Sequence, residues 1–507
     1  MSRSQREKGI ILSYVTMAFN LLIGFIFTPF LTRTLGDSEY GLYTSAASII
    51  AFIKMLDMGL GNSMVRFASK MKAEKDKPGE MKLNGMFLLM FTGIGILSVF
   101  VGLGVSVNIG SFLEKFTPEE VERVRLIFLI LLINIALSFP FNVVSAQLSS
   151  HERFAFLKIY NLVTDMCRYG LEAIILVTGF KSVGLAVAST FVSVVSKLVP
   201  IIYCKRNIEI KFSFKNFDKA IFREVASYSF FIFLNLLVDQ LYANTDKLLL
   251  GRYIGTSAVA IFGIASNLSR DFNLFSTSIS GVFLPNITKL VATKTGMQEI
   301  SKTFIRTSRL QFIILSFVYT GFLIFGKQFI VFWVGDFYTE AYYITLILMS
   351  TSIVTMSQNI GVSVLQAMNK HRVRSVMYLV IAVLNLGLTI PMCIKWSGIG
   401  AAIATAFGNF CGRIVFMNWY YHKKIGLDMK AYWKGVFLRL GIVPAIYGTI
   451  GYLLLGKNAY PNVFALLAAI IAYTLIYAPF AWFLVLNQEE KGLVIEKLNG
   501  LKRKLKK

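Results

Sequence analysis

Long apolar stretches separated by short polar segments run along this chain from residue 10 to residue 486. Each stretch has about 20 residues or more, enough for a helix to cross about 30 Å of hydrocarbon while it satisfies its own backbone hydrogen bonds. The pattern predicts an all-α polytopic membrane protein with about fourteen transmembrane helices. The predicted spans are residues 10–33, 40–60, 83–106, 125–149, 156–179, 183–204, 222–249, 256–280, 305–332, 340–366, 375–394, 399–421, 434–455 and 462–486.

The apolar segments also repeat. Residues 32–48, TRTLGDSEYGLYTSAAS, match residues 251–266, GRYIGTSAVAIFGIAS, when Gly36 is aligned with Gly255, an offset of 219. We infer that one six-helix unit occurs twice. Further matches are Gln147 with Gln366 and Arg153 with Arg372 at the same offset, then Lys197 with Arg413 at an offset of 216 after a three-residue contraction.

Because six is an even number, the second copy keeps the orientation of the first, and a pseudo-two-fold axis along the membrane normal is expected. We predict an amino-terminal six-helix lobe of residues 1–210, a carboxy-terminal six-helix lobe of residues 211–425, and two additional helices with a basic tail over residues 426–507. Two such lobes facing each other across a central cleft are typical of alternating access.

Composition and charge agree with a membrane protein. The chain is 55% hydrophobic and 16% charged, and its net charge is +25. If the amino terminus is cytoplasmic, the inner segments hold 36 of the 52 Lys and Arg residues and the outer loops hold 10. This distribution follows the positive-inside rule, so we predict that both termini are cytoplasmic and that the basic blocks set topology rather than bind nucleic acid.

Eleven ionisable residues lie well inside the predicted spans, where insertion costs roughly 2.5 to 3.5 kcal/mol each, so they are expected to face protein or water. Asp165, Arg168 and Glu172 have the spacing of one helical face, and Arg168 can pair with either acid. The remaining eight are Lys54, Asp57, Lys197, Asp239, Arg270, Asp271, Arg413 and Arg439.

The basic members of this set are candidate substrate-binding residues. Lys197 and Arg413 occupy repeat-related positions in the cytoplasmic half, and neither has an obvious acidic neighbour on its own helix. Facing one another across a cleft, they would form a cavity suited to a phosphate-bearing anion. Arg168, Arg270 and Lys54 are predicted to continue this positive path, although buried ion pairs that fix helix register are an alternative role for Arg168.

Three carboxylates, Asp57, Asp239 and Asp271, are candidate ion-coupling residues. A carboxylate in a low-dielectric cavity can bind and release a proton or sodium ion as the exposure of the cavity changes. A plain salt bridge from Arg270 to a neighbouring acid is the alternative for this region.

No cofactor or metal site is expected. Cys167, Cys204, Cys393 and Cys411 have no metal or disulfide spacing, and the three histidines lack companion ligands. The phosphate-cradling pattern GxxxxGK[ST] is absent, so transport would need an ion gradient, a membrane potential or the substrate gradient.

Two stretches carry a family resemblance. PFLTRTLGDSEYGLYTSAASIIAFIKMLDMGLGNSMVRFASK, from residue 29, resembles the first two helices of polysaccharide-biosynthesis membrane proteins, the O-antigen-type lipid-linked oligosaccharide flippases. NTDKLLLGRYIGTSAVAIFGIA, from residue 244, resembles the corresponding second-lobe segment. These proteins belong to the multidrug/oligosaccharidyl-lipid/polysaccharide exporter superfamily, and the fourteen-span layout agrees along essentially the whole chain.

The resemblance implies a flippase of the bacterial cytoplasmic membrane. It would move an undecaprenyl-diphosphate-linked repeat unit to the outer leaflet for O-antigen, capsule or exopolysaccharide assembly, and it could work with polysaccharide-assembly machinery. A multidrug exporter or a lipid II flippase of the same superfamily is the alternative. An enzyme is not expected, because the longest outer loop, about residues 107–124, is short and EKFTPEEVER within it is typical of a solvated helix.

Overall fold

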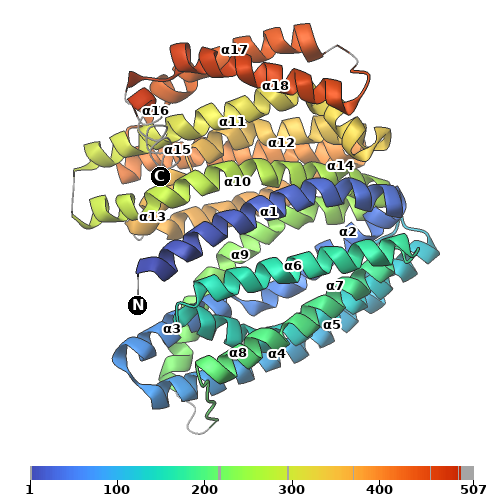
Figure 1. The fold of residues 1–507 in the computed structure, drawn as a ribbon, viewed down its shortest axis with the longest axis vertical. Helices are drawn as coiled ribbons and strands as arrows, with labels where there is room; N and C mark the ends of the chain where they lie inside the picture. The colour runs from blue at the N-terminus through green and yellow to red at the C-terminus, as the bar shows by residue number, and fades with distance from the viewer. Residues whose placement is uncertain are drawn as a thin grey trace, which may run out of the picture. The chain divides into compact units, whose positions relative to one another are not determined.

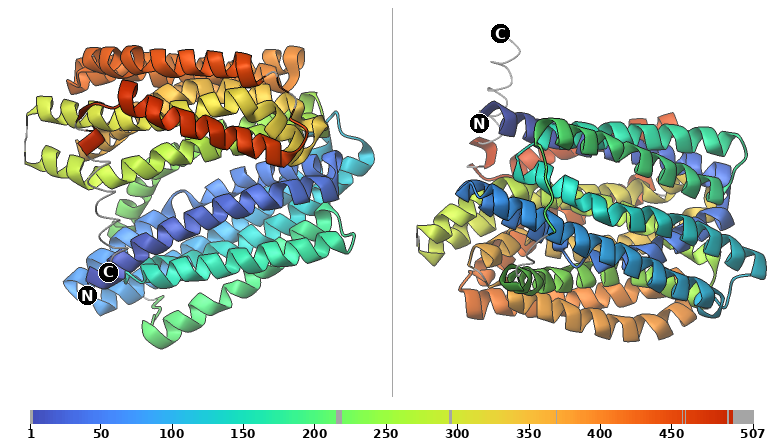
Figure 2. Two further views of the ribbon diagram at one scale, coloured as in Figure 1. Left: turned by 45° about the horizontal axis from the view of Figure 1, so that its top comes forward. Right: turned by 90° about the horizontal axis from the view of Figure 1, so that it is seen from below.

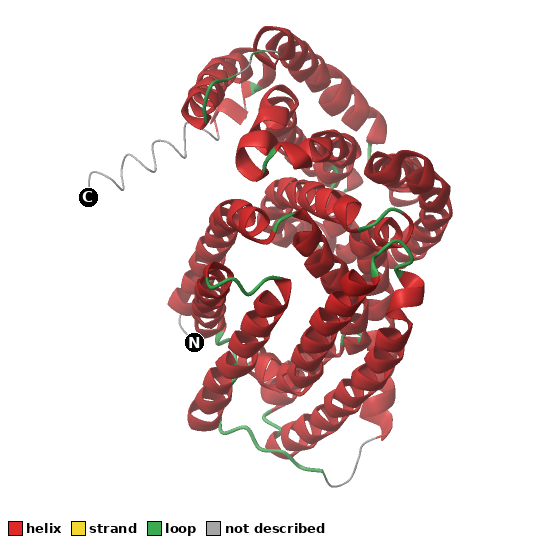
Figure 3. Cartoon of the chain, turned by 90° about the vertical axis from the view of Figure 1, so that its right-hand side faces the viewer, coloured by secondary structure: helices red, strands yellow, loops and turns green. Residues whose placement is uncertain are grey.

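The computed structural model describes residues 3–214, 219–293, 296–368, 370–456, 458, 460–488 and 490–492, and the regular structure within these ranges is helical (Figure 3). The chain divides into two compact units. The first comprises residues 1–263 and 382–404, and the second comprises residues 264–381 and 405–507. The predicted lobe boundaries at residues 210 and 425 stay a prediction.

The first unit is built mainly from long helices (Figure 1). Two helices, α10 (Thr256–Ala292) and α14 (His371–Asn409), contribute residues to both units. The other helices of the first unit are α1 (Arg3–Leu35), α2 (Asp37–Lys54), a short 3-10 turn (Met55–Asp57), α3 (Leu60–Glu74), α4 (Lys77–Phe112), α5 (Pro118–Ser150), α6 (Phe154–Val177), α7 (Ser182–Ser196), α8 (Leu198–Asn207) and α9 (Lys219–Tyr253).

The second unit mixes long α-helices with short wide π-helical turns. Its α-helices are α11 (Met297–Val334), α12 (Glu340–Ser357), α13 (Ile360–Ala367), α15 (Met417–Tyr420), α16 (Met429–Tyr432), α17 (Arg439–Gly451) and α18 (Val463–Phe480), with a 3-10 turn at Asp336–Thr339. The π-helical turns are Phe410–Phe416, Tyr421–Ile425, Trp433–Leu438, Tyr452–Gly456 and Ala481–Val485.

Each of the fourteen predicted ranges overlaps helical structure, which confirms a polytopic helical membrane protein. Within the described residues, ten helices are long and apolar enough to cross a membrane, or eleven if the bent pair α12–α13 is one span. Helices α6 and α10, which carry charged residues near their middle, are not among the ten. Two ranges predicted as separate spans lie in one helical stretch, residues 372–425, interrupted at Trp396 and Ser397. The count of fourteen stays a prediction.

Small residues set the closest helix pair of the first unit. Helices α4 and α5 run side by side (Figure 1, Figure 2). A Cβ added at Gly95 would lie 2.9 Å from the carbonyl oxygen of Ala136, and one added at Gly102 would lie 2.4 Å from the side chain of Leu132. Since lipid supplies no hydrophobic force between two apolar helices, this close backbone approach is what allows the pair to pack tightly.

The core of the second unit gathers around α11. Phe304 and Tyr432 are fully buried and lie with ring centroids 5.7 Å apart. Further along α11, the hydroxyl groups of Thr320 and Tyr473 are 2.6 Å apart, which joins α18 to α11. The last two described helices, α17 and α18, therefore pack directly on the second unit.

A buried ion pair fastens the end of the described chain to this core. Arg309 on α11 donates from Nε to Glu490 at 2.7 Å and from Nη2 to the second carboxylate oxygen at 3.1 Å. The guanidinium also donates to the carbonyl oxygens of Gly435 and Val485 at 3.0 and 3.2 Å. The side chain of Glu490 is fully buried. This bidentate geometry satisfies both charges, which is the condition under which a buried pair is tolerated.

Glu490→Ala is expected to lower the stability of the protein by about 3 to 5 kcal/mol, because it leaves the Arg309 guanidinium buried beside two carbonyls without its counter-charge. Thermal unfolding of the purified protein in detergent measures this loss. The matched control is Arg306→Met, which removes an exposed charge one turn away and should change the melting temperature little. Equal melting temperatures for Glu490→Ala and the control would contradict the role of the pair.

Candidate functional site

The helix that begins at Asp37 breaks near its middle, and a carboxylate lies at the break. Asp57 ends a short 3-10 turn, and the next two residues, Met58 and Gly59, have left-handed backbone conformations with φ of 50° and 73°. Asn142 on α5 donates to Asp57 at 3.2 Å, and the backbone N–H of Gly61 also interacts with this carboxylate. Broken helices of this kind are where membrane transporters commonly place ion sites.

Three charged residues of α6, Asp165, Arg168 and Glu172, form the ion cluster that their spacing predicts. Arg168 lies 3.2 Å from Glu172 and 3.5 Å from Asp165. Glu172 is 2% exposed, whereas the side chains of Arg168 and Asp165 are about 30% exposed. The guanidinium carbon of Arg168 also lies 4.1 Å from the ring centroid of Tyr169, which packs edge-on against Phe27 of α1. Arg168 is therefore held by two carboxylates and a ring.

Lys197 lies at the junction between α7 and α8. Its ammonium group donates to the hydroxyl and the carbonyl oxygen of Ser193 at 2.8 and 3.1 Å. It also lies 5.7 Å from the ring centroid of Phe141 on α5, within the range of a cation–π interaction. These contacts of Lys197 are to neutral groups, in contrast to those of Arg168.

The repeat-related Arg413 lies in the second unit on the π-helical turn that follows α14. Its guanidinium carbon is 4.9 Å from the ring centroid of Tyr378, and the guanidinium carbon of Arg374 is also 4.9 Å from that centroid. Two arginines of the second unit thus share one aromatic ring. The sequence analysis singled out Arg413 but not Arg374 or Tyr378.

The remaining predicted site residues are Lys54, Asp239, Arg270 and Asp271. Arg270 and Asp271 form an ion pair at 3.8 Å, the salt bridge that was the alternative for this region, and the Arg270 side chain is 68% exposed. Lys54 is exposed at the end of α2, and Asp239 is exposed on α9.

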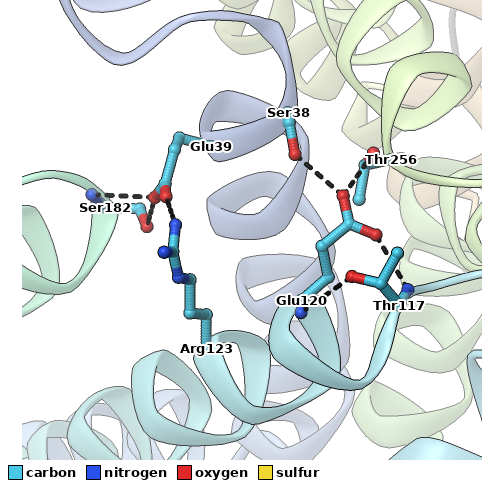
Figure 4. Close-up of polar contacts among 7 residues, drawn as sticks. All are labelled: Ser38, Glu39, Thr117, Glu120, Arg123, Ser182 and Thr256. Carbon is cyan, nitrogen blue, oxygen red and sulfur yellow. Dashed lines mark hydrogen bonds and ion pairs between the residues drawn. The ribbon is translucent and has the colours of Figure 1, made fainter.

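A polar cluster that the sequence analysis missed lies where α2, α5 and α10 begin, at the end of the first unit predicted to be outside (Figure 4). Glu120 forms a capping box with Thr117 at the start of α5. Its carboxylate oxygen Oε1 accepts from Ser38 at 2.8 Å and from Thr256 at 3.2 Å. The signal in the sequence was the T-x-x-E pattern within EKFTPEEVER, which marks a helix start.

Both of the stretches that resemble each other, residues 32–48 and 251–266, contribute to this cluster. Ser38 belongs to the first of these stretches and Thr256 to the second, and one carboxylate binds both. The backbones also meet, since a Cβ added at Gly41 would lie 2.3 Å from the carbonyl oxygen of Thr256. The small residues and hydroxyl groups of the repeat thus form a contact between its two copies.

A second carboxylate lies beside the first (Figure 4). Glu39 is 6% exposed, and it accepts hydrogen bonds from Arg123 on α5 and from the hydroxyl of Ser182 at the start of α7. Glu39 and Glu120 together tie the outer ends of α2, α5, α7 and α10.

Among the described residues, no group of three or more His, Cys, Asp or Glu side chains could hold a metal ion. The chain is thus a multi-pass helical membrane protein, and its ion pairs and hydrogen bonds place charged groups at helix breaks and helix ends. This is the class to which transporters with broken helices belong.

The chain belongs to the polysaccharide biosynthesis protein family, whose model matches residues 6–291. A putative O-antigen transporter of Shigella flexneri is 23% identical over 400 residues, which cover 77% of this chain and 92% of the relative. A probable flippase of Haloferax volcanii, AglR, is 22% identical over 413 residues, 79% of this chain and 80% of the relative.

Two solved structures share the fold. The lipid II flippase MurJ, in an inward closed conformation, matches with a TM-score of 0.73 and 16% identity over 93% of this chain and 98% of its own. An inward-facing multidrug resistance transporter of the MATE family matches with a TM-score of 0.63 and 17% identity over 79% of this chain and 96% of its own. The predicted resemblance to the polysaccharide-biosynthesis family is confirmed by the family model.

Arg168→Met is expected to destabilise the protein by about 2 kcal/mol or more, because it leaves Glu172 buried beside Asp165 without a cation. The neutral triple variant Asp165→Asn, Arg168→Met, Glu172→Gln is expected to recover most of the lost stability, since it removes all three charges together. Thermal unfolding in detergent measures both. If the triple variant is folded and transports normally, Arg168 is structural; if it is folded and inactive, Arg168 contacts the substrate.

Proposed function

We propose that this protein is a flippase that moves a polyprenyl-diphosphate-linked oligosaccharide, a precursor of O-antigen, capsule or exopolysaccharide, from the inner to the outer leaflet of the bacterial cytoplasmic membrane. Its membership of the polysaccharide biosynthesis family is the observation that carries the proposal. Relatives named as an O-antigen transporter and a flippase support it, as does the fold shared with a lipid II flippase.

Lys197 and Arg413 are the residues we propose to bind the diphosphate. Lys197 is held by neutral groups, so its positive charge is not cancelled by the contacts seen here. Arg413 and Arg374 both contact the ring of Tyr378, so two positive charges lie close together in the second unit. Exposed Lys54 and Arg270 would extend the positive path, whereas Arg168 already pairs with two acids.

Alternating access is the mechanism we propose, and Glu120 has a definite part in it. If the predicted lobes 1–210 and 211–425 separate at their outer ends, the hydrogen bonds from Ser38 and Thr256 to the same carboxylate cannot both persist. The Glu120 cluster therefore stabilises the outwardly closed state. Both termini would then be cytoplasmic, as the charge distribution predicts.

Asp57 is the carboxylate best placed to couple transport to a proton or sodium ion. It lies at a helix break and has an amide partner, Asn142, rather than a close ion pair. By contrast, Asp271 pairs with Arg270. Asp239 remains a further candidate on α9.

The lipid II flippase and the multidrug exporter remain competing functions, since solved structures of both share the fold. They differ in substrate, so one transport assay offered three substrates separates them. The basic residues named above favour a diphosphate over the organic cations expected of a drug exporter.

The double variant Lys197→Ala, Arg413→Ala is expected to flip a fluorescent undecaprenyl-diphosphate oligosaccharide at least about tenfold more slowly than the wild type, because charge-assisted hydrogen bonds to the diphosphate are lost. Proteoliposomes measure the rate with and without imposed proton and sodium gradients. The same assay shows whether Asp57→Asn abolishes any gradient dependence.

The matched control is Lys205→Ala with Lys423→Ala, which removes one exposed lysine from the same predicted side of each unit. Equal rates for the site variant and the control would refute the assignment of Lys197 and Arg413. A wild type that flips lipid II or exports a drug, but does not flip the oligosaccharide lipid, would refute the proposed function.

Cross-linking position 38 to position 256 is expected to stop transport, because both hydroxyl groups contact one carboxylate oxygen in the outwardly closed state. The variant Ser38→Cys, Thr256→Cys, in a background without the four native cysteines, is treated with a short bis-methanethiosulfonate reagent. Transport should fall to background and return on reduction. The two single-cysteine variants should be unaffected, and full transport by the cross-linked protein would exclude opening at this contact.

A further inference from the structure

A pocket of about 690 Å³ lies at the end of the second unit that is predicted to be cytoplasmic. Lys370 and Arg372, at the start of α14, supply one side of it. Lys424, near the end of the helical stretch that follows α14, supplies another. The rest of the lining is apolar or aromatic: Val373, Phe416, Trp419 and Tyr420.

The chemistry of this pocket fits a phosphate beside an apolar body. Three cations line it and no carboxylate does, and all three are exposed. Trp419, which is 49% exposed, gives the pocket an aromatic wall. Basic pockets between transmembrane helices on the cytoplasmic side are characteristic of sites for anionic lipid headgroups, and the volume is that of a ligand site.

The first repeat provides an internal comparison, because the corresponding positions are chemically different. At the offset of 219, Lys370 corresponds to His151, whose pKa is lowered by burial despite the nearby carbonyl oxygen of Gln147. At the offset of 216, Lys424 corresponds to Ile208. Two of the three cations are thus specific to the second repeat.

The aromatic wall differs between the repeats as well. Trp419 corresponds to Tyr203, and in the first unit Tyr203 is covered by Phe156, with ring centroids 3.8 Å apart and an interplanar angle of 18°. The residue that corresponds to Phe156 is Ser375, which has no ring to place over Trp419. Trp419 instead has the tilted ring of Phe416 beside it, with centroids 5.6 Å apart, and stays 49% exposed.

We propose that Lys370, Arg372 and Lys424 form a binding site for the phosphate-bearing headgroup of a lipid in the inner leaflet, with Trp419 against its apolar part. The phosphate accepts hydrogen bonds from the three cations, and the acyl or prenyl chain lies in the bilayer. An anionic phospholipid and a polyprenyl diphosphate present the same chemistry. Binding of a polyprenyl diphosphate here rests on the proposed function, whereas binding of an anionic phospholipid does not.

The pocket leads toward the predicted substrate residue of this unit. Arg413, Phe416, Tyr420 and Lys424 follow one another at intervals of three or four residues along one helical stretch. On α14, Arg372 in the pocket is two residues from Arg374, which shares Tyr378 with Arg413. Residues two apart on a helix do not face each other, so the connection to Arg413 runs from Lys424 along its own helical stretch rather than along α14.

Native mass spectrometry of the purified full-length protein tests the site with three probes: phosphatidylglycerol, phosphatidylcholine and undecaprenyl diphosphate. The variant Lys370→Gln, Arg372→Gln, Lys424→Gln is expected to bind the anionic probes, phosphatidylglycerol or undecaprenyl diphosphate, at least about tenfold more weakly than the wild type does. The matched control, Lys158→Gln, Lys205→Gln, Arg206→Gln, removes three charges from the same predicted side of the first unit and should bind as the wild type does.

The two sources are distinguished by competition. If undecaprenyl diphosphate does not displace tightly bound phosphatidylglycerol, the pocket is a phospholipid site. If it does displace the phosphatidylglycerol, the pocket is a headgroup site for the carrier lipid. Equal binding by the pocket variant and the control, or binding of phosphatidylcholine as tight as that of phosphatidylglycerol, would overturn the site. The charge reversal Lys424→Glu repeats the test with a single change if the triple variant unfolds.

Failure of this site and failure of the proposed function give different results. If the wild type binds phosphatidylglycerol through the pocket but flips no oligosaccharide lipid, the proposed site is supported and the proposed function is refuted. If the wild type flips the oligosaccharide lipid and the pocket variant binds every probe normally, the proposed function is supported and the proposed site is refuted.

Discussion

The constraint on which the rest of this structure depends is that hydrocarbon offers no hydrogen-bond partners. Backbone groups must therefore be paired within helices, and every charged side chain inside a span needs a partner from the protein or from water. The α6 cluster satisfies this requirement locally, because Arg168 reaches both Asp165 and Glu172 on its own helix. Asp57 satisfies it across helices, by an amide from α5 at the place where its own helix is broken.

The same constraint explains why polar residues are organised differently at the two predicted ends of the molecule. At the outer end of the first unit, carboxylates accept hydrogen bonds from hydroxyls and an arginine, so helix starts are linked by short polar contacts (Figure 4). At the inner end of the second unit, cations gather around an open pocket without a carboxylate in its lining. The first arrangement holds helices together, and the second forms the proposed headgroup site.

The sequence allowed good prediction of whatever depends on local spacing. Apolar runs located the helices, and the i, i+3 and i+4 spacing on α6 predicted its ion cluster. The pairing of Arg309 with Glu490 was not predicted, because the two residues are 181 positions apart and no periodicity connects them. Glu120 was interpreted as part of a solvated helix for a similar reason, since its partners Ser38 and Thr256 come from other helices.

The repeat gives the clearest view of how one helical framework can serve two purposes. Near residues 38 and 256 the two copies keep small and hydroxyl-bearing residues, and these form a contact with each other. Near residues 151 and 370 they have diverged, so that a half-buried histidine and a stacked aromatic pair in one copy correspond to an exposed lysine and a half-exposed tryptophan in the other. A helical scaffold fixes the positions of helix ends but not their chemistry, so one copy can pack closed while the other keeps an open basic pocket.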